Sequence, residues 1–174
     1  MNIKLSINVN EKTSFRKFSR VAAAFPELWE KLQKNEQRTV KGFDFYAMSI
    51  EDFCKIILND DIAAVFPEIN SKRLKVLRFI RIQNTIRNQI RDFQNFLDKT
   101  NIPYTAEIRA CNMNTIEYTA EEGILITLKE FYGLENLEKA QKMTVYEYCI
   151  ARKCNYNQYV FNRNQEKRLK NARK

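Results

Sequence analysis

The 174-residue sequence contains no histidine, and it has only three glycines and three prolines. Without histidine the chain lacks the usual general base near neutral pH and the commonest ligand of transition metals, which excludes Ser-His, Cys-His and HExxH chemistry. Three scattered glycines, at Gly42, Gly123 and Gly133, cannot form a GxGxxG or GxxxxGK[ST] phosphate-binding loop. We therefore expect a protein that is not an enzyme and that holds no cofactor.

Long apolar runs are also missing. The longest stretches, such as VAAAF at 21–25, are far shorter than the roughly 20 residues that span a membrane. The first residues, MNIKLSINVNEK, contain no apolar segment of the kind that a secretory signal carries. With 44% hydrophobic residues the chain can still bury a core. We expect a globular protein that is made in a cytoplasm and has no membrane partner.

Cysteines and paired acids are the remaining candidates for chemistry. The cysteines are spread along the chain, at Cys54, Cys111, Cys149 and Cys154. The last two lie within a predicted helix and point about 140° apart around its axis, which does not suit a zinc site, so we expect free thiols. The pairs Asp60-Asp61 and Glu121-Glu122 lie near predicted helix starts. We favour stabilisation of the helix dipole over Mg²⁺ binding for these acids and expect no metal site.

Hydrophobic periodicity predicts a mainly helical α+β fold, with a single domain over residues 1–162. Alternating apolar residues predict a short N-terminal strand, at Ile3, Leu5, Ile7 and Val9. Residues 104–120 predict a small hairpin. Apolar residues at helical spacing predict helices over 13–25, from Pro26 onward, over 49–58, 71–99 and 119–132, and from Val145 towards the C-terminus.

Helix-end signals support several of these predictions. Thr119 with Glu122, and Thr144 with Glu147, have the spacing of a capping box at a helix start. Gly133 stands where the C-cap of the preceding helix belongs. These signals place the boundaries of the last two long helices within a few residues.

The longest predicted helix, residues 71–99, contains neither glycine nor proline. Its apolar stripe covers about five turns, at Phe79, Ile82, Ile86, Ile90, Phe93 and Leu97. Four more apolar residues near its start point to other sides of the helix, at Leu74, Val76, Leu77 and Ile80. Either a central position in the fold or a contact with another subunit would explain this start. We take the four residues as candidate subunit-contact residues.

The net charge of +9 is concentrated in two segments. Residues 72–91 contain seven Lys and Arg and no acid, and residues 163–174 contain six with one acid. Candidate contacts with nucleic acid or with a partner protein are Arg73, Arg78, Arg81, Arg87, Arg91, Lys167, Arg168, Lys170, Arg173 and Lys174. The arginines of 72–91 point in several directions, so pairing with acids of this chain or of a neighbour is the alternative. We predict that residues 163–174 form a basic helical C-terminal arm.

One stretch carries a resemblance to a known group of proteins. Residues 121–159, EEGILITLKEFYGLENLEKAQKMTVYEYCIARKCNYNQY, combine an amphipathic helix ending at Gly133, a short helix, and a further helix opened by Met143-Thr144 with Glu147. This pattern resembles small helical structural and assembly proteins of tailed bacteriophages. The Asn- and Lys-rich, Gly-poor composition is similar to that of proteins from AT-rich phages of the gut Bacteroides type, including the crAss-like group.

The resemblance implies a head-tail connector, a ring or adaptor subunit that forms a homo-oligomer and contacts neighbouring virion proteins such as portal or tail subunits. It also fits a tail-assembly chaperone. We therefore expect a non-enzymatic structural protein of the virion, located at the head-tail junction and made in the host cytoplasm. A nucleic-acid-binding regulatory protein is the alternative from a different functional class.

Overall fold

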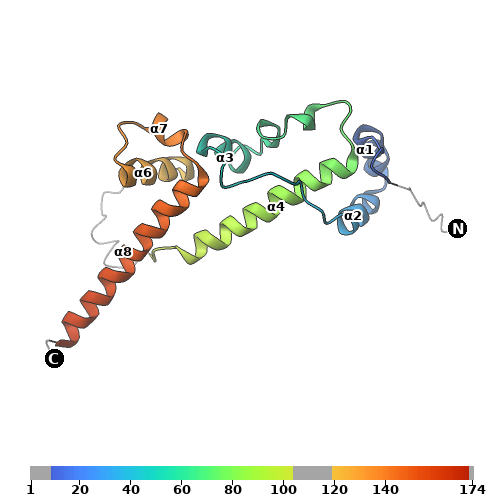
Figure 1. Cartoon of the computed structure of the whole chain (residues 1–174). Helices are drawn as coiled ribbons and strands as arrows, with labels where there is room; N and C mark the ends of the chain where they lie inside the picture. The colour runs from blue at the N-terminus through green and yellow to red at the C-terminus, as the bar shows by residue number, and fades with distance from the viewer. Residues whose placement is uncertain (1–8, 104–118, 173–174) are drawn as a thin grey trace. The chain divides into compact units, whose positions relative to one another are not determined.

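The computed structural model describes residues 9–103 and 119–172 (Figure 1). Within these ranges the chain is mainly helical, as predicted, and its extended pairing is limited to two isolated bridges. Of the hairpin predicted at 104–120, residues 104–118 lie outside the described residues, and Ala120 is helical. All but Val9 of the predicted N-terminal strand also lies outside them.

The chain divides into two compact units. Unit 1 consists of Met1–Phe43 and Asp60–Asp92, and unit 2 consists of Asp44–Asn59 and Phe93–Lys174. Helix α4, Val76–Lys99, contributes its first part to unit 1 and its last part to unit 2. The prediction of one domain over residues 1–162 stays a prediction.

Unit 1 is built from two short helices packed on the first part of α4. Its elements before α4 are α1 (Phe15–Ala24), α2 (Pro26–Asn35) and the 3-10 turns η1 (Ile62–Ala64) and η2 (Pro67–Asn70). Proline suits the first position of a helix because its missing N–H needs no partner there, which explains the break at Pro26. Phe18, Val76 and Ile80 form the centre of its core.

Helix α4 begins at Val76, five residues later than the sequence predicts. The residues before it join the start of α1 instead of the helix. Lys75 pairs with Ser14 in an antiparallel bridge, the Phe15 N–H donates to the Leu74 carbonyl (2.9 Å), and the Val76 N–H donates to the Thr13 carbonyl (3.0 Å). The starts of α1 and α4 are thereby held together.

The four candidate subunit-contact residues lie in the interior of unit 1. The exposed fractions of Leu74, Val76, Leu77 and Ile80 are 6%, 0%, 7% and 0%. Side chains of α1 and α2 pack against the cluster formed by Val76, Leu77 and Ile80. The central position in the fold is therefore the correct explanation of the apolar helix start, and the prediction of a subunit contact at these residues is wrong.

Unit 2 contains α3 (Ile50–Ile57), α6 (Ala120–Tyr132), α7 (Leu137–Gln141), α8 (Val145–Ala172) and the end of α4. Its core is aromatic where α3, α4 and α8 meet. The ring of Phe93 lies 5.0 Å from that of Phe53, 6.0 Å from that of Phe45 and 6.2 Å from that of Tyr148, measured between ring centroids. Leu128 of α6 is fully buried in the same unit.

A second bridge joins two helix starts in unit 2. Ser49 pairs with Thr144, the Ile50 N–H donates to the Met143 carbonyl (2.7 Å), and the Val145 N–H donates to the Met48 carbonyl (3.0 Å). The predicted capping boxes are confirmed at both α6 and α8, and Gly133 ends α6 in the left-handed conformation with φ of 63°. These local signals fix the ends of the helices as predicted.

Helix α8 continues to Ala172 without a break at Arg163, where the sequence predicts a division. None of the described residues from Lys153 onward is buried. The basic C-terminal segment is therefore helical as far as Ala172, and its separate behaviour as an arm stays a prediction.

Candidate nucleic-acid interface

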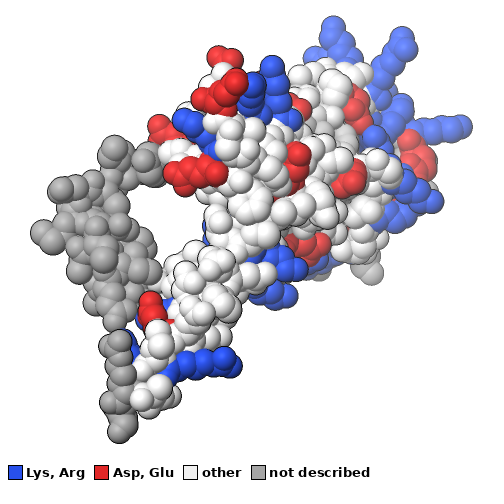
Figure 2. All heavy atoms as spheres, turned by 60° about the vertical axis from the view of Figure 1, so that its left-hand side comes forward, with Lys and Arg blue, Asp and Glu red and all other residues white. Residues whose placement is uncertain are grey.

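Six basic side chains surround the joined starts of α1 and α4 in unit 1. We call them the basic surface: Arg16, Lys17, Arg20, Lys72, Arg73 and Lys75. All six are exposed, and none forms an ion pair with another residue of the described ranges. Lys and Arg side chains project into solvent from this part of the chain in Figure 2.

The helix starts at the basic surface lack the acids and the capping bonds that usually offset the positive end of a helix dipole. Neither α1 nor α4 has an acid in its first turn, and the N-cap Ser14 makes no side-chain capping bond. Lys75, which precedes α4, carries an ammonium group that cannot accept a hydrogen bond and so cannot cap the helix. Because a helix start carries about half a positive charge, two such ends among six cations create a site that favours anions such as phosphate.

Three of the predicted arginine contacts instead pair with acids of the same unit. Arg78 binds Glu68 at 2.8 Å, and Arg91 lies 3.8 Å from its neighbour Asp92. Arg81 binds Glu11 and also Glu36, the latter at 3.0 Å. Pairing within the chain, the alternative at the sequence level, is thus what the structure shows for these three. Arg73 and Arg87 are exposed and have no ion pair within the described residues.

The cluster around Arg81 joins α2 to α4. Glu36 is the C-cap residue of α2, its side chain is 5% exposed, and it accepts hydrogen bonds from both Arg38 and Arg81. The bond from Arg38, followed by that from Arg81, lowers the pKa of Glu36 to about 2, although burial opposes this shift. Arg81 therefore holds the fold together and is poorly placed to meet an external phosphate.

The C-terminal candidates lie on the last turns of α8. Lys167, Arg168 and Lys170 are exposed, and the two final candidates, Arg173 and Lys174, lie outside the described residues. Cations at the C-terminal end of a helix complement its dipole, so these side chains are locally favourable. The starts of α1 and α4 offer their cations no such favourable interaction with the helix dipole.

The two buried thiols are not activated for nucleophilic chemistry. Cys54 and Cys149 are buried, and burial raises the pKa of each thiol to about 11, so both are protonated at neutral pH. Cys154 is exposed, and Cys111 lies outside the described residues. Within residues 9–103 and 119–172, no group of three or more Cys, Asp and Glu is arranged to hold a metal ion.

The two acid pairs have different roles. The Glu122 carboxylate accepts a hydrogen bond from the Thr119 N–H at 2.8 Å, which completes the capping box of α6, and Glu121 lies in the same first turn. Asp60 adopts a left-handed backbone conformation with φ of 54°, and Asp61 precedes η1 without capping it. The first pair therefore lies at a helix start as predicted, and Asp61 lies at the start of η1 without making a capping bond.

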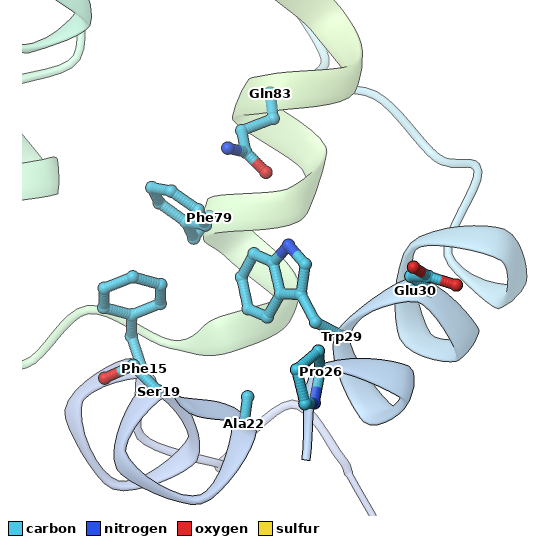
Figure 3. Close-up of a pocket in the computed structure, with 8 residues that line it drawn as sticks. All are labelled: Phe15, Ser19, Ala22, Pro26, Trp29, Glu30, Phe79 and Gln83. Carbon is cyan, nitrogen blue, oxygen red and sulfur yellow. The ribbon is translucent and has the colours of Figure 1, made fainter. Parts of the chain in front are cut away.

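An open pocket of about 470 Å³ in unit 1 was not predicted from the sequence (Figure 3). It is lined by Phe15, Ser19, Ala22, Pro26, Trp29, Glu30, Phe79 and Gln83. The rings of Phe15, Trp29 and Phe79 stand beside one another around the space. The available sequence signal was the apolar spacing of α1, which assigns Phe15 and Ala22 to a packed face and does not show that part of this face stays open.

No protein-family model, curated protein or solved structure matches the chain. Among the described helices, none is both long enough and apolar enough to cross a membrane. Because fold alone does not define function, functional conclusions rest on the chemistry of the residues at the site.

Proposed function

We propose that the chain is a non-enzymatic protein that binds nucleic acid through the basic surface of unit 1. The observation that carries this proposal is the set of unpaired cations around two helix starts without acids. Every other α-helix that the structure describes has at least one acid in its first turn. Cations near a helix start cost about 0.3–1 kcal/mol each, so their concentration at this one place supports a role in binding an anionic partner.

The distribution of charge between the two units supports the same proposal. Unit 1 has 16 Lys and Arg against 8 Asp and Glu, a formal charge of +8, whereas unit 2 has 14 against 13, a charge of +1. Phosphate binding by such a surface releases counterions from the nucleic acid, and it therefore weakens as the salt concentration rises. Arginine adds bidentate contacts to phosphate oxygens.

Fluorescence anisotropy with labelled 20-nucleotide DNA and RNA at about 50 and 200 mM salt tests the proposal. The triple variant Lys17→Gln/Arg73→Gln/Lys75→Gln should bind more weakly and lower the slope of log K against log[salt] by about 0.7–0.9 for each phosphate that is no longer neutralised. The matched control Lys129→Gln/Lys142→Gln/Lys153→Gln removes three exposed cations from unit 2 and should leave the slope unchanged. Undetectable binding at about 50 mM salt, or equal weakening in both variants, would contradict the proposal.

A second candidate function is that of a structural subunit of a tailed-phage virion, a ring or adaptor at the head-tail junction, or of a tail-assembly chaperone. The exposed second half of α8 favours this candidate. Phe161 and Leu169 are 56% and 61% exposed on a helix segment in which no described residue is buried. Most helical stability in proteins comes from packing an apolar face, so such a segment suits insertion into a neighbouring subunit.

Two measurements test the structural candidate. Light scattering of the purified protein should show a closed homo-oligomer, and mass spectrometry with electron microscopy of purified particles should find the chain in many copies per virion. Deletion of residues 163–174 should weaken assembly if this segment contacts an acidic face of a neighbour. A monomer that is absent from virions would rule out the ring-subunit function.

A further inference from the structure

We propose that the pocket between α1, α2 and α4 in unit 1 receives a base of a single-stranded nucleic acid. This inference rests on the proposed binding of nucleic acid and names the part of the ligand that the pocket recognises. The basic surface would hold the phosphates, and the pocket would hold a base.

The pocket offers aromatic faces to a planar ligand (Figure 3). The ring centroids of Phe15 and Phe79 lie 4.3 Å apart, and Trp29 lies 5.9 Å from Phe79 and 6.2 Å from Phe15. All three side chains are partly exposed. The volume of about 470 Å³ falls within the range of about 300–1,000 Å³ that is typical of small-molecule sites. Stacking on aromatic side chains is the common way in which proteins hold bases of single strands.

The polar side chains at the pocket wall suit the edge of a base better than they suit an aliphatic ligand. The Ser19 hydroxyl donates to the Arg16 carbonyl (3.2 Å) and can still accept from a ligand. Gln83 Oε1 accepts from Gln33 (3.4 Å), which leaves the Gln83 amide NH₂ to donate, and Glu30 can accept. The edges of nucleic-acid bases present both donors and acceptors within one plane. A carboxylate would repel phosphate, so the position of Glu30 in the pocket and outside the basic surface fits a division between base and backbone.

Cations lie at both ends of the pocket's α4 wall. Two cations flank Phe79 and Gln83: Lys75 directly precedes α4, and Arg87 lies one turn beyond Gln83, about 6 Å further along the helix axis. Both are exposed without an ion pair in the described part of the chain. On α1, Arg16 follows directly after Phe15. This alternation of cations and aromatic rings complements a strand whose phosphates flank each base, and an apolar peptide would leave the cations unused.

A single strand is the expected form of the ligand. In a duplex the faces of the bases are stacked on one another and cannot reach a protein ring unless a base is flipped out. A single strand exposes these faces without that cost. We therefore expect single-stranded ligands to bind more tightly than a duplex that carries the same number of phosphates per strand.

Trp29 is the only tryptophan of the chain, so its fluorescence reports directly on the pocket. The full chain is titrated at about 50 mM salt with three probes: a 20-nucleotide oligo(dT), an abasic strand with the same number of phosphates, and a 20-base-pair duplex. Oligo(dT) should quench Trp29 and bind at least about fivefold more tightly than the abasic strand, the lower limit expected for one stacked base.

A pocket-filling variant provides the second arm. Ser19→Leu fills the pocket without changing charge and should remove the preference for oligo(dT) while the abasic strand binds as before. The control Ala23→Leu lies exposed on the same helix outside the pocket and should keep the preference. Equal affinity of the unchanged chain for oligo(dT) and the abasic strand, with constant Trp29 fluorescence, would overturn the base pocket but leave nucleic-acid binding intact. Binding to none of the three probes would overturn both proposals.

Discussion

In both units the same antiparallel bridge joins two helix starts, but the side chains around the bridge differ. In each unit an isolated antiparallel bridge joins two helix starts, Ser14 with Lys75 in unit 1 and Ser49 with Thr144 in unit 2. The hydrogen bonds follow one pattern, because the first residue of each helix donates to the residue before the partner's bridge position. The same backbone arrangement therefore occurs with two different sets of surrounding side chains.

The side chains around the two bridges differ in how far they stabilise the helix starts. In unit 2, Ser49 accepts a hydrogen bond from the Asp52 N–H, and Thr144 forms a capping box with Glu147. In unit 1, Ser14 makes no capping bond and basic residues replace the acids. Capping contacts are thus absent at one of two similar helix pairs, and departures of this kind from local rules are expected at functional sites, in agreement with the proposed function.

The largest expected effect comes from truncating a core side chain in one unit at a time, which tests whether the two units unfold separately. Ile80→Ala in unit 1 and Leu128→Ala in unit 2 each truncate a fully buried side chain and should cost about 2–5 kcal/mol. Hydrogen exchange should show that Ile80→Ala exposes amides of α1 and the start of α4, while Leu128→Ala exposes those of α6 and α8. An equal loss of protection throughout the chain in both variants would instead support the single domain predicted over residues 1–162.

A somewhat smaller effect concerns acid stability. The pKa of Glu36 is lowered from 4.5 to about 2, so its contribution is fully present above about pH 4.5 and is lost as the pH falls towards 2. Glu36→Gln should lower the free energy of unfolding of unit 1 by about 2–3 kcal/mol at pH 7.

Urea unfolding at pH 7 and at low pH measures this effect. The difference between Glu36→Gln and the unchanged chain should shrink as the pH approaches 2. The exposed acid Glu27 serves as a control, since Glu27→Gln should cost under about 1 kcal/mol. A difference that stays constant with pH would show that Glu36 acts through packing instead of charge.

The next comparison asks which cationic segment meets nucleic acid. The triple variant of the basic surface, Lys17→Gln/Arg73→Gln/Lys75→Gln, should weaken binding about tenfold or more at about 50 mM salt, since each phosphate left without a cation reduces the counterion release. Lys167→Gln/Arg168→Gln/Lys170→Gln should have a smaller effect, because these cations are explained by the end of α8. The reverse order of effects would transfer the interface from unit 1 to the C-terminal segment.

The smallest expected effect tests the two serines at the bridges. Ser49→Ala removes a capping bond and should cost about 1 kcal/mol, whereas Ser14→Ala removes none and should change the free energy of unfolding by less than about 0.5 kcal/mol. Thermal unfolding of both variants measures the difference. Similar costs for the two serines would mean that the start of α1 is capped in solution.

Local signals predicted the helices well. Pro26, Gly133 and the capping boxes at Thr119 and Thr144 act through residues three or four positions away, so the sequence alone contains the necessary information. The start of α4 was placed too early because Lys75 pairs with Ser14, which is distant in the sequence.

The site was harder to predict than the fold. The sequence grouped the arginines of 72–91 by proximity, yet Arg78 and Arg81 are neutralised by Glu68 and Glu36, and only the fold brings these acids close. The cations of α1 form no run of their own, so the sequence does not mark them as candidates. The aromatic pocket depends on three helices that meet in space, and no local spacing marks it.

The order of the two bridges along the chain also bears on synthesis. Ser14 with Lys75 encloses the first segment of unit 2, and Ser49 with Thr144 encloses the second segment of unit 1, so the units are interleaved. A cut after Asp92 would leave Asp44–Asn59 of unit 2 attached to unit 1, so no single cut separates the two units completely. On the ribosome unit 1 can close once residue 92 has emerged, whereas unit 2 must wait for α8. The segment Asp44–Asn59 therefore stays without its partners for several seconds at about 5–20 residues per second, an interval in which a chaperone could bind it.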